Sequence, residues 1–249
     1  KNRIKENFVT IITHELRSPL VAVEQYFEVL LGGISGEIPD NQREILSKCK
    51  RRVMWLLSLV NEWLSMARIQ DTLSLKEPNE CAIDAVLEEA IDLVRIQAEE
   101  KKIDIVFSVP DTIPALMGNH ELLIHLFMNL YSNAIKYNLP GGKIISTVTD
   151  MNSSLKMCIQ DTGMGIPEES IPFIFDEFYR VRRDSTGATQ KYRDTGTGLG
   201  LAIVKKIVDA HNGHINVASQ VDVGTTFTVT LPKKQPLKPA EHQQSGMVT

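Results

Sequence analysis

A histidine followed directly by a glutamate stands in an apolar run near the start of the chain. The run, FVTIITHELRSPL at residues 8–20, contains His14, Glu15, Ser18 and Pro19. An imidazole can act as a nucleophile, and a neighbouring carboxylate can accept the proton that the ring loses. Pro19 has no N–H for the carbonyl of Glu15, so we expect a helix to bend or loosen there. Taken alone, the stretch fits a solvated helix face with an accidental proline equally well.

Polar residues at helical spacing form a second candidate site. Asn129, Asn133, Lys136 and Tyr137 stand at i, i+4, i+7 and i+8, so they share roughly one face of a helix. Two amides, an ammonium group and an aromatic ring could offer metal ligation, charge for a phosphate and a stacking surface. The alternative is a polar face that only meets water, although paired asparagines are unfavourable inside a helix.

Two glycine-containing segments follow. Asp161, Gly163 and Gly165 come directly after a predicted strand, where glycines let the backbone approach a ligand and the carboxylate can accept a hydrogen bond from an amine such as that of adenine. A simple turn is the alternative. The second segment opens a predicted helix, whose N–H groups and dipole favour a phosphate; it comprises Gly196, Thr197, Gly198, Leu199 and Gly200. It matches neither the dinucleotide fingerprint nor the P-loop, so by itself it is a weak signal.

A basic, polar stretch precedes the second glycine segment. The sequence FIFDEFYR at residues 173–180 leads into residues 181–195, which include Arg182, Arg183 and Lys191. This stretch has little to bury, so we expect a mobile loop that could close over a phosphate site as a lid. A plain solvated loop is the alternative.

Helical periodicity dominates the first part of the chain. Apolar residues recur at helical spacing over residues 1–31 and again from about 40 to 67, with a break at Gly32, Gly33, Gly36 and Pro39. We therefore predict an antiparallel helical hairpin. Two helices bury little surface alone, so we expect two copies to form a dimeric four-helix bundle. Trp55 and Trp63 are interpreted as packing residues of these helices.

Helices and strands alternate irregularly after Asp71–Asn79, which is interpreted as a linker with a short strand. Helices are predicted at 82–101, 119–137 and 198–211, and strands at 103–109, 143–150, 155–161, 215–218 and 225–231. The pattern indicates an α+β fold. The predicted domains are residues 1–72 for the hairpin, 73–234 for the second domain and 235–249 for a disordered tail.

Composition excludes several classes of protein. The net charge of -4 gives no argument for nucleic-acid binding, and Cys49, Cys81 and Cys158 lack metal-ligand spacing, so they are interpreted as free thiols in a reducing compartment. No apolar run is long enough to span a bilayer. His211 and His214 flank a helix stop and no further ligand completes a metal site, so a structural role is favoured.

Together, the five segments in this order resemble the sensor histidine kinases of two-component signalling, across about residues 1–232. His14–Pro19 is similar to their phosphoacceptor box, and Asn129–Tyr137 to their N box. Asp161–Gly165, Phe173–Phe178 and Gly196–Gly200 are similar to the first glycine box, the F box and the second glycine box.

The resemblance implies the hairpin followed by an α/β-sandwich ATPase domain with a mixed sheet and helices on one face. It also implies ATP and Mg²⁺, with γ-phosphoryl transfer to His14, Glu15 as the base, and onward transfer to an aspartate of a response-regulator receiver domain. The implied roles are Mg²⁺ ligation by Asn133, phosphate contacts for Asn129, Lys136 and Arg180, adenine contacts for Tyr137 and Asp161, and further nucleotide contacts for Gly163, Gly165, Phe178, Gly196, Thr197, Gly198, Leu199 and Gly200.

Two positions depart from the family pattern. Ser18 stands where threonine or asparagine is common, so phosphatase activity toward the regulator is left open. Asn119 stands where aspartate is usual, at a helix start that asparagine also caps well. The resemblance implies a cytoplasmic catalytic portion and a sensor domain upstream of Lys1, and it leaves membrane anchoring of the full-length protein open.

Two other functions are compatible with parts of this pattern. Gyrase, MutL-type and heat-shock-chaperone ATPases share the implied fold and work as ATP-driven clamps, but they lack a histidine-bearing hairpin before the domain. A non-catalytic dimeric scaffold would keep the fold without binding Mg-ATP.

Overall fold

The computed structural model describes residues 2–34, 36–75, 78–110, 112–181 and 196–234, and within them all side chains except those of residues 2–14, 67, 68 and 70–75. The predicted lid, apart from Val181, and the predicted tail at 235–249 therefore lie outside the described residues.

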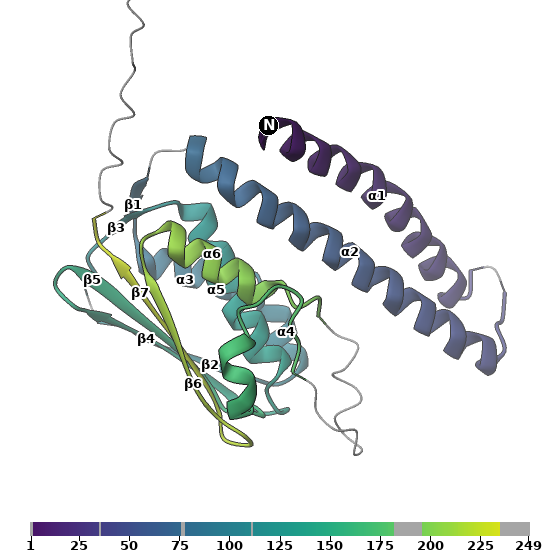
Figure 1. Ribbon diagram of the computed structural model, residues 1–249. Helices are drawn as coiled ribbons and strands as arrows, with labels where there is room; N and C mark the ends of the chain where they lie inside the picture. Colours follow the sequence, from purple (N-terminus) through teal and green to yellow (C-terminus); the bar gives the residue numbers. More distant parts are fainter. Residues whose placement is uncertain (1, 35, 76–77, 111, 182–195, 235–249) are drawn as a thin grey trace, which may run out of the picture.

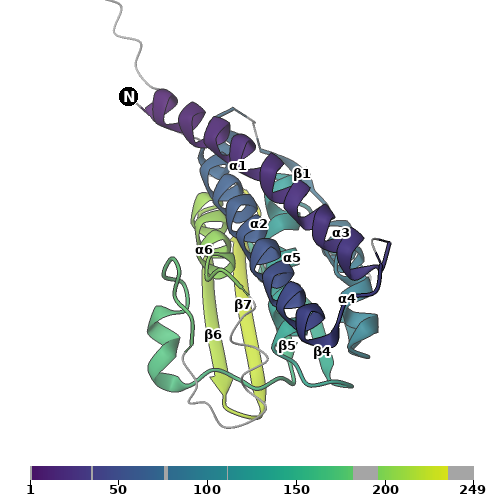
Figure 2. The ribbon, with the colours of Figure 1, turned by 90° about the vertical axis from the view of Figure 1, so that its right-hand side faces the viewer.

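The first part of the chain is a helical hairpin. Helix α1 (Asn2–Leu31) and helix α2 (Asp40–Leu75) lie side by side and antiparallel (Figures 1 and 2). The turn between them contains Gly33 and Gly36 at positive φ, a backbone conformation that glycine adopts without steric cost. Pro19 lies inside α1, and the helix continues past it to Leu31.

Helix α2 is longer than the sequence predicted. It continues to Leu75, so the linker expected from Asp71 onward is partly helical, and the short strand β1 (Asn79–Cys81) follows soon after. Ile69 of α2 is buried in the main hydrophobic core.

The second domain is built on a mixed sheet, as predicted. The strand order is β2-β4-β5-β7-β6, in which β2 and β4 are parallel and the other neighbours are antiparallel. The strands are β2 (Asp104–Ser108), β4 (Lys143–Asp150), β5 (Ser154–Asp161), β6 (His214–Gln220) and β7 (Gly224–Pro232). The last two are longer than predicted. Strand β3 (Leu116–Gly118), which the sequence did not predict, pairs with β1 in a separate small sheet.

Helices cover one face of this sheet, and the hairpin lies beyond them (Figures 1 and 2). They are α3 (Ile83–Asp92), α4 (Arg95–Glu100), α5 (His120–Lys136) and α6 (Gly200–Ala210). The single helix predicted at 82–101 is therefore two helices, separated by a turn at Leu93 and Val94. A 3₁₀ helix, η1 (Glu168–Phe173), was not predicted either.

The core lies between the sheet and these helices. Alternate residues of β5 and β7 are buried, such as Met157 and Val229, and they face the apolar side of α5 with Phe127 and Tyr131. The hydroxyl of Tyr131 bonds to Ser146 at 2.8 Å, which satisfies both buried groups. This packing fixes α5, and with it the polar face that carries Asn129 and Asn133.

The start of α5 is held by two specific side chains. Asn119 caps the first turn by accepting a hydrogen bond from Leu122 N at 3.1 Å, as its position predicted. The buried ring of His211 accepts from the Asn119 N–H at 3.0 Å and bonds to the carbonyl of Ile207 at 2.8 Å. His211 therefore has a structural role, which ties the end of α6 to the start of α5.

In the described part of the chain, no helix is long and apolar enough to cross a membrane. The three cysteines are free thiols, as expected.

Candidate nucleotide-binding site

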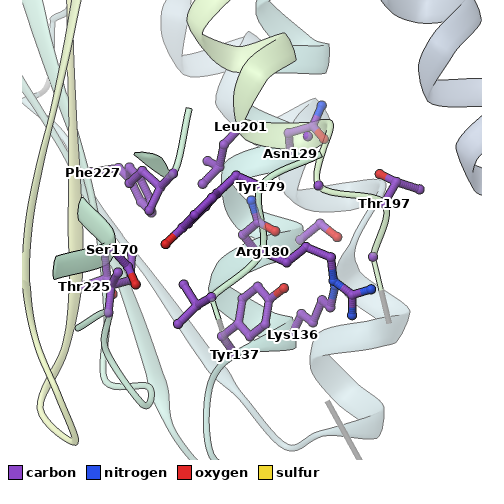
Figure 3. Close-up of a pocket in the computed structure, with 18 of the residues that line it drawn as sticks. Asn129, Lys136, Tyr137, Ser170, Tyr179, Arg180, Thr197, Leu201, Thr225 and Phe227 are labelled. Atoms are coloured by element: carbon purple, nitrogen blue, oxygen red, sulfur yellow. The ribbon is translucent and has the colours of Figure 1, made fainter. Parts of the chain in front are cut away.

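A cavity of about 1030 Å³ opens between α5, α6, η1 and the ends of β5 and β7 (Figure 3). It collects residues from all four segments of the second domain that the sequence had singled out. The predicted residues among those that line it are Asn129, Asn133, Lys136, Tyr137, Asp161, Gly165, Phe178, Arg180, Gly196, Thr197, Gly198 and Gly200. A cavity of this size and depth fits a nucleotide.

One wall is the polar face of α5. The amide nitrogen of Asn129 donates to the carbonyl of His125 at 2.8 Å, which turns its oxygen toward Gly200 at the start of α6. Asn133 follows one turn later. The Lys136 ammonium lies 4.8 Å from the centre of the Tyr137 ring, close enough for a cation–π contact.

Asp161 forms the buried end of the cavity. Its Oδ1 accepts hydrogen bonds from the N–H of Gly163 at 2.8 Å and of Thr225 at 3.3 Å. Burial raises the pKa of this carboxyl group, and the two hydrogen bonds act in the opposite direction. Because both bonds end on Oδ1, the second oxygen can accept a hydrogen bond from a ligand in the cavity. Gly163 contributes through its backbone N–H.

Two glycines allow close backbone approaches that a side chain would prevent. Gly165 has a φ of +63°, and a Cβ there would lie 2.0 Å from the carbonyl oxygen of Gln220. Gly198 has a φ of +81°, and its carbonyl accepts from Phe178 N at 3.0 Å. The second glycine segment is therefore joined directly to the segment that carries Phe178 and Arg180.

The opposite end of the cavity is cationic. The side chains of Lys136 and Arg180 lie near each other there, with Thr197 beside them (Figure 3). Helix α6 begins at Gly200, so its first N–H groups also face this region. Leu199 contributes only backbone, because its side chain is fully buried and its N–H donates to the Thr197 hydroxyl at 3.2 Å. Cations and free N–H groups at one end suit a chain of phosphates.

Several lining residues were missed from the sequence. Tyr179 crosses the cavity between Leu201 and Phe227 (Figure 3), and Thr225 supports Asp161. Glu62 also lines the cavity, although it belongs to α2. No local spacing links these residues, because they come together only through the sheet order and the packing of α2 on the second domain.

The histidine motif lies outside this cavity. His14 is part of α1, and Figures 1 and 2 show α2 between α1 and the second domain. Glu15 and Ser18 are exposed on α1. The side chain of His14 is outside the described residues.

The mixed sheet, the polar face of α5 and the two glycine segments define an ATPase-type nucleotide-binding domain. Residues 118–235 match the family model described as Histidine kinase-, DNA gyrase B-, and HSP90-like ATPase. Residues 4–72 match the His Kinase A (phospho-acceptor) domain. The chain belongs to the sensor histidine kinases of two-component systems, and it comprises their catalytic core, as the motifs predicted.

Named relatives agree with this family. The sensor-like histidine kinase SenX3 of Mycolicibacterium smegmatis is 31% identical over 229 residues, which are 92% of this chain and 58% of that protein. The sensor protein SrrB of Staphylococcus aureus is 33% identical over 237 residues, which are 94% of this chain and 39% of that protein. The crystal structure of full-length ShkA in complex with AMPPNP shares the fold, with a TM-score of 0.66 at 24% identity over 92% of this chain and 46% of that one. The chain thus spans 39–58% of the length of these relatives.

Proposed function

We propose that this chain is an ATP-dependent protein histidine kinase that phosphorylates its own His14 and passes the phosphoryl group to an aspartate of a response-regulator receiver domain. One observation carries the proposal. A single cavity joins the polar face of α5, Asp161 and both glycine segments, in a chain whose hairpin bears the histidine motif. A sensor domain outside this chain would supply the signal.

The cavity residues would hold the nucleotide at both ends. The open oxygen of Asp161 would accept a hydrogen bond from the adenine amino group, and Tyr137 would lie along the base. Lys136, Arg180 and the first N–H groups of α6 would hold the phosphates, since each places positive charge at the end of the cavity that Thr197 also lines. Asn129 would add its amide oxygen nearby.

Asn133 would hold Mg²⁺ through its amide oxygen. The described residues contain no group of three or more His, Cys, Asp or Glu side chains placed to bind a metal. One protein oxygen in a phosphate site nevertheless fits Mg²⁺, which commonly keeps its waters and takes further ligands from substrate phosphates. When bound, the ion would offset the charge on the phosphate oxygens.

The transfer itself would take place at His14. An imidazole nitrogen of His14 would attack the γ-phosphorus in line, while the bond to the β–γ bridging oxygen breaks and its electron pair leaves with ADP. Glu15, the next residue, would accept the ring proton. The N–P bond would then break as an aspartate carboxylate of the regulator takes the phosphoryl group. Ser18 would hold a water that attacks the phosphorus of the regulator's phosphoaspartate, which releases inorganic phosphate and the free carboxylate.

Dimerisation would complete the hairpin. Large apolar side chains of both helices are exposed in the single chain, and they include Tyr26, Ile45, Met54 and Trp63 at 50–68% exposure. A second copy would cover them in a four-helix bundle, which buries the apolar faces that two helices leave open.

Incubation with γ-labelled ATP tests the proposed function. We expect acid-labile, base-stable label on the wild-type protein, none on a His14→Ala variant that binds ATP normally, and unchanged label on His214→Ala as the control. His214 is exposed on β6, away from the cavity. Label on His14→Ala would refute the assignment of the nucleophile. Free phosphate without protein label would support the ATP-driven clamp, and failure to bind Mg-ATP would support the scaffold.

A further inference from the structure

Helix α2 contacts the second glycine segment through two side chains. The indole N–H of Trp55 donates to the carbonyl of Gly196 at 3.2 Å, and the carboxylate of Glu62 accepts a hydrogen bond from the Thr197 hydroxyl. The two residues are seven apart, which is two helical turns, so they share one face of α2. Leu59, between them, packs against the main core. The contact is therefore part of a packed interface.

Glu62 lies within the cavity at its cationic end. It lines the cavity together with Lys136, Gly196 and Thr197. The Lys136 ammonium lies directly over Gly196, since a Cβ on that glycine would be 2.3 Å from Nζ. Burial raises the pKa of the Glu62 carboxyl group, and the hydrogen bond from Thr197 and the charge of Lys136 act in the opposite direction. A carboxylate thus stands among the groups that would bind phosphate.

We propose that Glu62 is a specificity-determining residue of the nucleotide site, which competes with nucleotide phosphates for Lys136 and Thr197 and is displaced when they bind. The inference rests on the proposed function only in that the cavity takes ATP. Two anions in one small cationic site repel each other, and the charge of a bound triphosphate exceeds that of one carboxylate. Binding of the phosphates therefore expels Glu62.

Displacement of Glu62 also affects α2. The hydrogen bonds of Glu62 and Trp55 hold α2 to Thr197 and Gly196, and loss of the first weakens the contact on that face. Because coupling between two events is reciprocal, the α2 contact weakens phosphate binding by the same factor by which bound phosphates weaken the α2 contact. A change that weakens the α2 contact therefore strengthens phosphate binding. Adenosine has no phosphates and does not reach the cationic end, so its affinity is independent of Glu62.

The first test compares nucleotide affinities of the full chain by titration calorimetry. Glu62→Gln keeps an oxygen for the Thr197 hydroxyl and removes the charge. We expect ATP to bind this variant about tenfold more tightly, as for removal of one like charge from a partly hydrated site, with adenosine unchanged. The control Glu44→Gln, at an exposed residue of α2 paired with Lys48, leaves both affinities unchanged. Equal ATP affinity in Glu62→Gln and wild type, weaker ATP binding, or tighter binding of adenosine would each overturn the proposal.

The second test reads the α2 contact itself. A Trp63→Phe variant keeps Trp55 as its one tryptophan, since the chain has two. We expect ATP, but not adenosine, to shift the Trp55 emission as its bond to Gly196 is lost. An ATP-bound protein with unchanged Trp55 emission would refute release of α2. Failure of the kinase is separable, because missing label on His14 with the expected affinities would refute only the proposed function.

Discussion

Replacing Lys101 by methionine would test how the C-terminal end of α5, which carries Lys136 at the cavity, is held in place. The Lys101 ammonium donates to the carbonyls of Ile135 at 2.9 Å, Lys136 at 2.6 Å and Asn138 at 3.0 Å. These carbonyls lie at or just beyond the end of the helix, where fewer N–H partners are available and the helix dipole places negative charge. The carbonyl of Ile135 also accepts from the Asn138 N–H at 3.3 Å. One ammonium group therefore binds three backbone carbonyls around Lys136 and Tyr137.

The expected loss follows from these three bonds. A single hydrogen bond to a charged group contributes about 1.5–3 kcal/mol to stability. The three bonds share one ammonium, and water can reach this partly exposed site after the substitution. We therefore expect a total loss of about 2–4 kcal/mol, less than the sum of three such bonds. Methionine keeps most of the apolar stem of lysine, so little of the loss comes from packing.

Urea unfolding followed by circular dichroism would measure this loss. Lys102→Met is a matched control, because the neighbouring lysine is exposed and undergoes the same chemical change. We also expect Lys101→Met to bind ATP more weakly, since the last turn of α5 would fray at the nucleotide. If Lys101→Met lost no more unfolding free energy than Lys102→Met, the capping argument would be wrong.

Two further substitutions test the supports of the site. Burial lowers the pKa of His211. Below the unfolded pKa of about 6.5, the unfolded chain therefore binds more protons than the folded one. We expect the free energy of unfolding to fall as pH decreases through the folded pKa, and to fall less steeply with pH in His211→Gln. Gly165→Ala adds a Cβ 2.0 Å from the Gln220 carbonyl at a φ of +63°, so it should abolish ATP binding, whereas Gly141→Ala has a similar φ of +78° and open space and should keep it. Unchanged ATP binding in Gly165→Ala, or an unchanged pH slope in His211→Gln, would contradict these expectations.

The parts predicted well from the sequence depend on local patterns. The polar face of α5 follows from the spacing of Asn129, Asn133 and Lys136 within one helix, and strands β4 and β5 follow from apolar alternation. Asn119 was predicted to cap a helix start from its position in the family pattern and from the capping preference of asparagine, and the structure confirms the cap. In each case the residues that determine the structure lie within a few positions of one another.

The parts that were missed depend on distant partners. Strand β3 has three residues, too few to show alternation, and it exists because it pairs with β1 across 39 positions, from Asn79 to Gly118 in one register pair. The break between α3 and α4 has no glycine or proline to mark it. Glu62 joins the cavity because α2 packs on the second domain, and no motif near position 62 indicates that contact.

Helix α2 therefore belongs to two structural units, and this places a condition on phosphoryl transfer. On one side it lies against α1, and on the other it contacts α6 and the Gly196–Thr197 segment (Figures 1 and 2). If His14 accepts the phosphoryl group, as we propose, the cavity must reach a residue on α1, beyond α2. Within one chain, the cavity reaches that residue by leaving the face of α2 that Trp55 and Glu62 hold. Expulsion of Glu62 by the nucleotide would supply that release at the moment when the phosphoryl donor is bound.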